Sequence, residues 1–271
     1  MKSLISVKDK VIVISGATGV LGETMTRSLA DGGAHVIVLG RNKNKVDKLV
    51  TSIKESGKSA FGAVADVTQK DQLLAVKDIL EAEFGAIDVL INAAGGNMAG
   101  ALILPDQTLA DADVNEMRKV IDLNYIGSFL PTQVFLQLLE KSDSASVLNI
   151  SSVAAHLPLT RVMGYASAKA AIENLTQFLA VEFAQKQKNP IRVNALAPGF
   201  FLTDQNRDLL TQKDGSLTNR GQTIIEHTPL GKFGEPEDLC GAIHWLCSDA
   251  AGFVTGTVVT VDGGFKAFSG V

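Results

Sequence analysis

The sequence predicts an α/β fold: a single Rossmann-type, doubly wound parallel sheet of about seven strands, with helices on both faces. Short apolar runs alternate with longer segments of helical periodicity, which is typical of βαβ units. Most of these runs are apolar at nearly every position, as expected of strands buried on both faces of a sheet. Right-handed crossovers through the intervening helices then give one open sheet.

Seven segments carry the apolar pattern of strands: 10–15, 35–40, 59–65, 88–94, 146–152, 192–198 and 257–263. Helical periodicity fits the segments 20–32, 43–57, 69–85, 115–140, 165–187 and 236–248. A further segment, 204–228, is polar, rich in turn signals, and lies between the last two strands. Because ligands bind beyond the carboxyl edge of such sheets, we expect a substrate lid at about residues 201–230 within one domain, 1–271.

Composition limits the classes of function. The 271 residues are 46% hydrophobic and 20% charged, with a net charge of −4, which is typical of a globular protein. No basic stripe favours nucleic acid, and no apolar run approaches the roughly 18 residues of a membrane span. We expect a soluble, cytoplasmic protein with a small-molecule partner. Cys240 and Cys247 lie two helical turns apart, too far for a disulfide, and lack the usual spacing of a metal site, so no metal is expected.

A glycine-rich turn, SGATGVLG, follows the first predicted strand and contains Gly16, Gly19 and Gly22. Glycine permits a tight turn and a close approach of the backbone to a phosphate, and the N-terminus of the next helix attracts the anion. The turn therefore predicts a dinucleotide site.

The second predicted strand ends at Gly40 and is followed by Arg41. Enzymes that prefer NAD usually have an acidic residue here against the ribose 2′-hydroxyl, whereas an arginine can accept the 2′-phosphate of NADP. The alternative is an ordinary solvated loop arginine. The expected cofactor is NADP or NAD, with a weak preference for NADP.

Tyr165 and Lys169 lie one turn apart on one face at the start of a predicted helix, GYASAKAAIENL. Reduction of a carbonyl leaves an alkoxide, which needs a proton and stabilisation of its charge. The tyrosine can supply the proton, and the lysine charge is expected to lower the tyrosine pKa from its usual value near 10. A chance pair at a helix end is the alternative.

Five motifs occur in order along nearly the whole chain: SGATGVLG, INAAG, LNYIGSF, NISS with YASAK, and APGFFLT. Together they resemble the short-chain dehydrogenase/reductase family. The resemblance implies a catalytic tetrad of Asn124, Ser152, Tyr165 and Lys169, with Ser152 chosen over Ser151 because it lies thirteen residues before Tyr165. Asparagine is disfavoured inside a helix, which independently suggests a role for Asn124. A dinucleotide-binding sensor without activity is a remote alternative.

The same resemblance implies a set of cofactor contacts: Gly16, Thr18, Gly19, Gly22, Arg41, Asp66, Val67, Asn92, Ala93, Gly95, Tyr165, Lys169, Pro198, Gly199 and Thr203. Asp66 would contact the adenine amino group, although an aspartate here is also a natural helix cap. The family usually has glycine in place of Val20, so Gly16 and Gly22 are expected to define the turn more than Gly19.

Within the family the chain is similar to the D-mannonate oxidoreductase group, also called fructuronate reductases, chiefly in the predicted lid and the tail GGFKAFSGV. This implies interconversion of D-fructuronate and D-mannonate by a homotetramer, with gluconate 5-dehydrogenase or 3-oxoacyl reductase activity as alternatives. A sugar acid needs a cation for its carboxylate and hydrogen-bonding groups for its hydroxyls. Candidates for these contacts are Asn97, His156, Arg161, Asn206, Arg207, Lys213, Asn219, Arg220 and Gln222.

Overall fold

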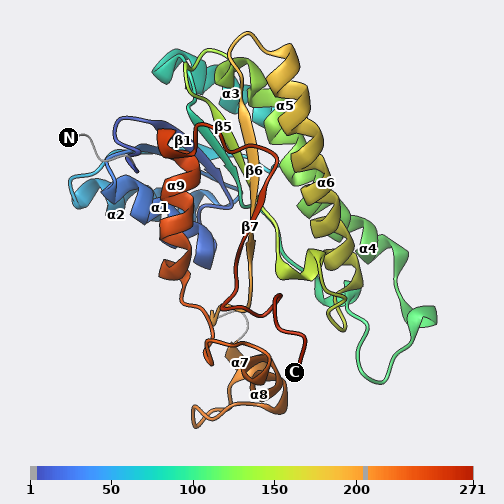
Figure 1. Cartoon of the computed structure of the whole chain (residues 1–271). Helices are drawn as coiled ribbons and strands as arrows, with labels where there is room; N and C mark the ends of the chain where they lie inside the picture. The colour runs from blue at the N-terminus through green and yellow to red at the C-terminus, as the bar shows by residue number, and fades with distance from the viewer. Residues whose placement is uncertain (1–4, 204–206, 271) are drawn as a thin grey trace.

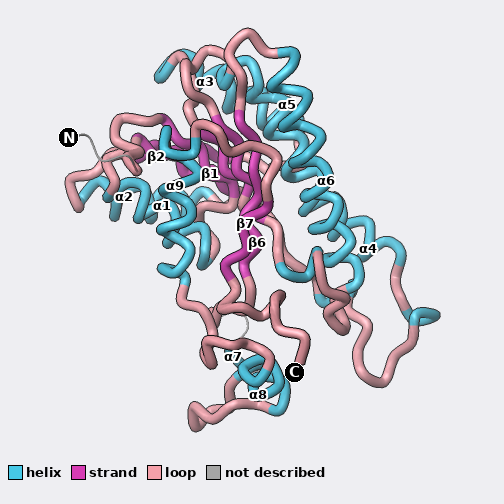
Figure 2. The backbone as a smooth tube through the Cα atoms, viewed as in Figure 1, coloured by secondary structure: helices cyan, strands magenta, loops and turns pink. Residues whose placement is uncertain are grey.

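Seven parallel strands form one sheet in the order β3-β2-β1-β4-β5-β6-β7 (Figures 1 and 2). This computed structural model describes residues 5–203 and 207–270. Every observed strand lies inside its predicted segment, so the predicted sheet is confirmed. The strands are β1 Val11–Ser15, β2 His35–Gly40, β3 Ala60–Val64, β4 Val89–Asn92, β5 Ser146–Ile150, β6 Arg192–Pro198 and β7 Val258–Val261.

Helices cover both faces of the sheet. They are α1 Val20–Asp31, α2 Lys43–Glu55, α3 Lys70–Phe84, α4 Val114–Ile121, α5 Gly127–Leu139, α6 Met163–Lys186, α7 Arg207–Leu210, α8 Asn219–Glu226 and α9 Cys240–Cys247. Helices α1, α2 and α9 pack on one face, and α3, α5 and α6 pack on the other (Figure 1). Within β1, Ile12 and Ile14 enter the first layer and Val13 the second. This alternation explains the continuous apolar runs, because the central strands are buried on both faces, whereas the edge strands β3 and β7 are only partly buried.

The helix predicted over 115–140 is divided into three parts. α4 is followed by a π-helical segment, Asp122–Ile126, and then by α5. Asn124 lies in the middle of the π-helical segment and is fully buried. Helical periodicity did not reveal this segment, because one wider turn hardly disturbs the apolar pattern. Such π-helical turns are rare and occur frequently at functional sites.

The strand order reverses beside β1, which pairs with β2 on one side and β4 on the other. At such a switch point the connections from the two central strands leave toward opposite faces and open a crevice. Ser15, the last residue of β1, is linked there to the loop that follows β4. Its hydroxyl accepts hydrogen bonds from the N–H groups of Ala93 and Ala94 at 3.1 and 3.2 Å.

Between β6 and α9 the chain forms a small helical insert, which contains α7 and α8 and lies beyond the carboxyl ends of β6 and β7 (Figure 1). Its base is pinned where Phe201 pairs with Gly234 in a β-bridge. The two helices pack closely, since a Cβ on Gly221 would lie 2.2 Å from the Leu210 carbonyl oxygen. The insert coincides with the predicted lid at 201–230, of which residues 204–206, including Asn206, lie outside the described residues. Its action as a lid stays a prediction.

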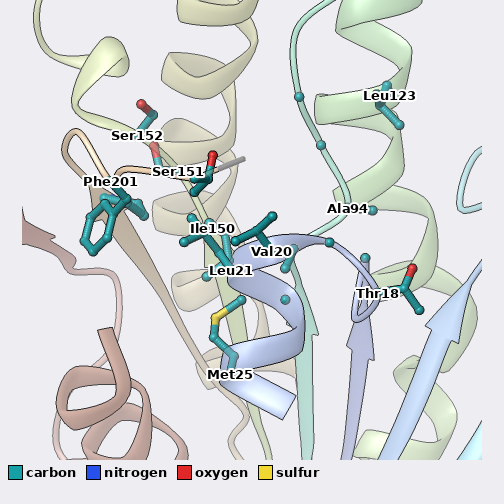
Figure 3. A pocket seen from close by; sticks show the side chains of 18 of the residues that line it. Thr18, Val20, Leu21, Met25, Ala94, Leu123, Ile150, Ser151, Ser152 and Phe201 are labelled. Atoms are coloured by element: carbon teal, nitrogen blue, oxygen red, sulfur yellow. The ribbon is translucent and has the colours of Figure 1, made fainter. Parts of the chain in front are cut away.

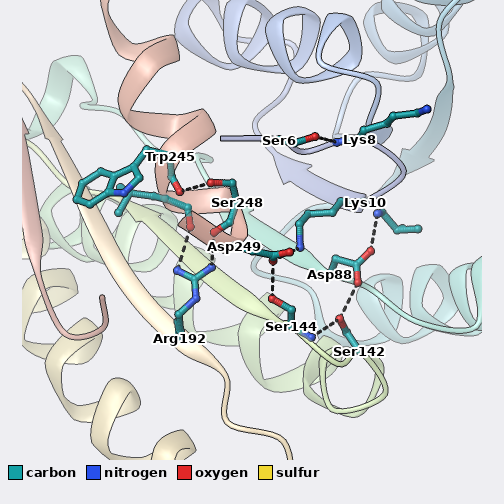
Figure 4. A network of polar contacts seen from close by, with 12 residues as sticks. Ser6, Lys8, Lys10, Asp88, Ser142, Ser144, Arg192, Trp245, Ser248 and Asp249 are labelled. Carbon is teal, nitrogen blue, oxygen red and sulfur yellow. Dashed lines mark hydrogen bonds and ion pairs between the residues drawn. The ribbon is translucent and has the colours of Figure 1, made fainter. Parts of the chain in front are cut away.

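A polar network ties together the amino edge of the sheet (Figure 4). Lys10 pairs with Asp249 at 2.9 Å, and the buried Arg192 donates to two backbone carbonyl oxygens at 3.1 and 3.2 Å. Asp88 accepts a hydrogen bond from the Ser142 hydroxyl at 2.6 Å. A partner within the chain is therefore present for each of the charged groups of Lys10, Asp88, Arg192 and Asp249. In the described part of the chain, no helix is both long and apolar enough to cross a bilayer.

Candidate active site

A cavity of about 440 Å³ opens at the carboxyl edge of the sheet, between the turn after β1 and the start of α6 (Figure 3). Its volume lies in the range of cofactor and small-molecule sites. The predicted site residues that line it are Gly16, Thr18, Gly19, Gly22, Arg41, Val67, Ala93, Gly95, Ser152, Tyr165, Lys169, Pro198, Gly199 and Thr203. Asp66, Asn92 and Asn124 do not line it.

The sequence analysis missed about half of the cavity wall. The missed lining residues are Val20, Leu21, Met25, Gly40, Ala65, Ala94, Gly96, Leu123, Ile150, Ser151, Phe200 and Phe201. Most are apolar neighbours of a predicted residue, and their backbone position beside a motif is the only signal that could have found them. The two phenylalanines place an aromatic wall at the start of the insert (Figure 3 labels Phe201).

Gly16 and Gly22 form the tightest part of the wall. Gly16 has a φ of +68°, and a Cβ there would lie 2.7 Å from the Ala93 carbonyl oxygen. A Cβ on Gly22 would lie 2.1 Å from the Gly16 carbonyl oxygen. Gly19 differs, since its Cβ would meet that oxygen at an ordinary 3.4 Å. The backbone therefore requires glycine at the first two positions, and the N-terminus of α1 beside them favours an anion.

Arg41 lies at the end of β2 and is largely exposed, with Nη1 3.7 Å from Asp66 Oδ2. Burial raises the pKa of the Asp66 carboxyl, but hydrogen bonds from Thr68 and the charge of Arg41 outweigh it and leave the pKa below its usual value. The Thr68 N–H and hydroxyl donate to Asp66 Oδ1 at 2.9 and 2.7 Å. Asp66 thus closes a turn and partly neutralises the arginine from outside the cavity wall.

Asn92 lies beneath the cavity rather than in its wall. Its Nδ2 donates to Thr132 Oγ1 and to Asn149 Oδ1, both at 2.9 Å. Asn149 in turn donates to Thr176 Oγ1 at 2.9 Å. These buried groups link β4 and β5 to the helices α5 and α6, so Asn92 supports the sheet under the site.

Asn124 holds the loop that follows β4. Its Nδ2 donates to the Gly96 carbonyl oxygen at 2.8 Å, and its Oδ1 accepts from the Gly96 N–H at 3.1 Å. A Cβ on Gly95 would lie 2.6 Å from Asn124 Oδ1 and 3.2 Å from Lys169 Nζ. The absence of a side chain at Gly95 therefore lets the asparagine and the lysine approach the same stretch of backbone.

Lys169 is 4% exposed, and its Nζ donates to the Ile150 carbonyl oxygen at 2.7 Å. The same atom lies 5.5 Å from the centre of the Tyr165 ring. Burial lowers the pKa of Lys169 to about 8. Burial also raises the pKa of Tyr165, and a hydrogen bond with Ser152 opposes this only partly. The predicted lowering of the Tyr165 pKa by Lys169 is therefore wrong for this structure, because desolvation of the phenolate dominates.

The two neighbouring serines both line the cavity (Figure 3) but have different partners. Ser152 hydrogen-bonds with Tyr165, whereas the Ser151 hydroxyl donates to Glu173 Oε1 at 2.7 Å. His156 Nε2 also lies 3.0 Å from Glu173 Oε1, within ion-pair distance but without the alignment of a hydrogen bond. The structure thus brings Ser152, Tyr165 and Lys169 together at the cavity, and it directs Ser151 toward Glu173.

A comparison with known proteins agrees with the family that the order of the motifs suggested. A family model described as enoyl-(acyl carrier protein) reductase matches residues 16–266. The chain belongs to the short-chain dehydrogenase/reductase family. As a member of that family it is an NAD(P)-dependent oxidoreductase acting on CH–OH groups.

Relatives of this short-chain dehydrogenase/reductase extend along its whole length. An uncharacterised oxidoreductase of Bacillus subtilis (strain 168), UxuB, is 44% identical, and the match covers 97% of this chain and 96% of the relative. A Haemophilus influenza protein described provisionally as a D-mannonate oxidoreductase, with bound NAD, is 41% identical with a TM-score of 0.91 and 98% coverage of both chains. A gluconate 5-dehydrogenase of Burkholderia cenocepacia J2315, in complex with NADP and tartrate, is 30% identical with a TM-score of 0.87 and covers 97% and 98%.

The cavity fits a dinucleotide on the chemistry of its own residues. The wall closest to the N-terminus of α1 includes the side-chain-free backbone of Gly16, Gly19 and Gly22, which permits the close approach that a pyrophosphate needs. The far wall carries a phenol, an ammonium and a hydroxyl, which can donate to oxygen. One end therefore suits phosphate binding, and the other suits proton transfer to a carbonyl.

Proposed function

We propose that this oxidoreductase interconverts D-fructuronate and D-mannonate. The observation that carries the proposal is the polar insert at the mouth of a cavity that holds Tyr165, Lys169 and Ser152. Similarity to the Haemophilus influenza protein, described provisionally as a D-mannonate oxidoreductase, supports this choice. The polarity of the insert disfavours the long apolar acyl chain of a 3-oxoacyl substrate.

The proposed chemistry divides between four side chains. A nicotinamide cofactor held in the cavity would supply the hydride that the carbonyl carbon accepts. Tyr165 gives its hydroxyl proton to the carbonyl oxygen, so the phenol O–H bond breaks as the alcohol O–H bond forms, and Ser152 donates a hydrogen bond to the same oxygen. Lys169, whose pKa is about 8, still holds a proton at neutral pH and returns one to the phenolate. Asn124 acts by holding the loop at Gly96 beside the lysine.

For the cofactor we propose both NADP and NAD, with NADP preferred. Arg41 stands at the end of β2, where an enzyme specific for NAD would need an acid, and its guanidinium is exposed to a ligand phosphate. Relatives are described with NAD and with NADP. Arg41→Ala should lower kcat/KM for NADPH about tenfold, the equivalent of one charge-assisted hydrogen bond, and leave that for NADH unchanged. If the wild type and the Arg41→Ala variant each had the same kcat/KM for NADPH as for NADH, Arg41 would have no role in cofactor selection.

Gluconate 5-dehydrogenase activity is the second candidate, favoured by the Burkholderia cenocepacia relative. A matrix of initial rates decides between them: NADH and NADPH, each with D-fructuronate, 5-ketogluconate and an acetoacetyl thioester. The proposal expects the highest kcat/KM with D-fructuronate. A higher value with 5-ketogluconate would assign the chain to the second candidate, and activity with the thioester alone would exclude both sugar acids.

We also propose a cytoplasmic homotetramer. α6 exposes Phe178 and Val181, at 62% and 57%, and Phe253 is fully exposed near β7. Exposed side chains of this size are typical of subunit contacts. Light scattering after size exclusion should give four times the 28.6 kDa chain mass, and Phe178→Glu should give a smaller species. A wild-type monomer would contradict this assembly, and cell fractionation tests the location.

A further inference from the structure

Two arginines lie close together between the insert and the loop before α6. Neither lines the cavity itself. Arg161 lies in the loop before α6, four residues ahead of Tyr165. Arg220 belongs to the first turn of α8 in the insert, and its Nη1 lies 3.4 Å from the Thr160 hydroxyl oxygen in the same loop as Arg161. The insert and the loop that leads into the catalytic helix therefore meet at two guanidinium groups and one hydroxyl.

Among the side chains that the structure describes, which exclude those of residues 204–206 and 208, neither arginine has a carboxylate partner. Four other arginines each have one or more polar partners: Arg27 with Glu23, Arg41 with Asp66, Arg118 with Asn115, and Arg192 with two carbonyl oxygens. Where the insert meets the loop, burial and then the charge of Arg161 lower the pKa of Arg220. Two half-buried like charges with no carboxylate beside them in the described residues oppose folding, so an anionic ligand bound between them would relieve this cost.

The backbone at Arg161 gives a second, independent sign. Its φ is +74°, and Asp9 is the only other non-glycine residue of the described ranges with a positive φ. A left-handed conformation is unfavourable for a long side chain and is often found at functional sites. Here the strained residue is held in place from outside the loop, because the Ile103 N–H donates to the Arg161 carbonyl oxygen at 3.1 Å.

We propose that Arg161 and Arg220, with the Thr160 hydroxyl, bind the carboxylate of the substrate and make the enzyme selective for acids over neutral polyols. Guanidinium groups match the geometry of a carboxylate and remain charged at all relevant pH values. The N-terminus of α8 next to Arg220 adds a favourable field. The inference rests on the proposed function, since the anion belongs to the molecule whose carbonyl reacts at Tyr165. A substrate carboxylate bound between Arg161 and Arg220 would link the insert to the helix that carries Tyr165.

The test compares binding of an acid and a neutral polyol in the presence of NADPH, a combination that cannot react. D-gluconate and sorbitol have the same number of carbons, and calorimetry measures the Kd of each. We expect the wild type to bind gluconate at least tenfold more tightly than sorbitol. Arg161→Asn and Arg220→Gln should each remove most of this preference, and asparagine tolerates the positive φ at 161. The control, Arg27→Gln, removes a paired arginine on α1 and should keep the preference.

Kinetics with D-mannonate give the second readout. Each variant should raise KM at least tenfold with little change in kcat, because the carboxylate binds in ground state and transition state alike. Arg220→Lys keeps the charge but loses the paired N–H donors of the guanidinium, so it should recover part of the affinity for D-mannonate that Arg220→Gln loses. Folded variants that retain the wild-type preference for gluconate would overturn the proposal. If fructuronate is not turned over but gluconate binding still depends on both arginines, the proposed reaction fails and this site stands.

Discussion

The two edges of the sheet treat their charged groups in opposite ways. At the amino edge, Lys10 pairs with Asp249 and the guanidinium of Arg192 donates to backbone carbonyls, so the chain itself neutralises or satisfies each charge (Figure 4). At the carboxyl edge, Lys169 is buried with a carbonyl oxygen as its partner, and burial together with the charge of Arg161 lowers the pKa of Arg220. Burial also lowers the pKa of Arg192 at the amino edge, but among the described residues only the carboxyl edge sets two guanidinium groups close enough to perturb one another. Perturbed groups of this kind cluster at functional sites.

This difference indicates that residues at the amino ends of the strands serve mainly stability, whereas residues at the carboxyl ends serve catalysis and ligand binding. Substitutions at the amino edge should change the free energy of unfolding and leave catalysis intact. Substitutions at the carboxyl edge should change catalysis or ligand binding, and some should make the fold more stable. Each of the following experiments tests one side of this comparison.

Tyr165→Phe should have the largest effect. Loss of the general acid should lower kcat by about 10²–10⁴-fold, whereas the midpoint of thermal unfolding and the Kd for NADPH should remain close to wild type. Steady-state rates, calorimetry and a fluorescence titration measure the three quantities. Full activity in the variant would exclude Tyr165 from the reaction.

Gly22→Ala and Gly19→Ala form a matched pair in the glycine turn. The new Cβ lies 2.1 Å from a backbone oxygen in the first variant and 3.4 Å from the same oxygen in the second. Overpacking should therefore destabilise the first by about 3 kcal/mol and weaken cofactor binding at least tenfold, although alanine is otherwise the better helix former. Urea unfolding and NADPH titration check this, and similar losses in both variants would contradict the close approach.

Lys169→Met should abolish turnover and yet stabilise the fold at pH 7. Because the pKa of Lys169 is lowered from 10.5 to about 8, both folded and unfolded chains are protonated below pH 8, where burial of the charge opposes folding fully. A gain of up to about 3 kcal/mol follows, less the lost hydrogen bond to Ile150. As pH rises from about 8 to 10.5, Lys169 of the folded wild type loses its proton and the cost of burying its charge disappears. The difference in the free energy of unfolding between the wild type and Lys169→Met should therefore shrink. Urea unfolding across this range checks the sign, and a variant less stable than wild type at pH 7 would refute it.

Arg192→Met tests the amino edge and should have the smallest effect of the series. Two buried carbonyl oxygens lose their donor, which should reduce the free energy of unfolding by about 2 kcal/mol. Since the cavity lies at the other end of β6, kcat/KM should stay at the wild-type value. A loss of activity without a loss of stability would break the separation of the two edges.

Much of the fold and of the site follows from local pattern. Strands β1 to β7 were predictable because each is a short, mostly apolar run, and Gly16 and Gly22 because only glycine fits a turn that tight. The spacing of Ser152, Tyr165 and Lys169, read with the family resemblance, was enough to select the three side chains that meet at the cavity. These features depend on residues near one another in sequence, or on motifs whose order is fixed by the topology.

Other features arise only when distant segments meet. The pKa of Tyr165 is raised by burial, which depends on how distant segments pack around the start of α6. The direction expected from the tyrosine–lysine pair alone was therefore wrong. The π-helical turn at Asn124 leaves the apolar periodicity nearly unchanged. Arg161 and Arg220 are 59 positions apart, and nothing in either local stretch predicts that their charges act on one another. Composition and spacing thus determined the scaffold and the reaction class, whereas tertiary packing decided the electrostatics, because desolvation and charge repulsion depend on what surrounds a group in space.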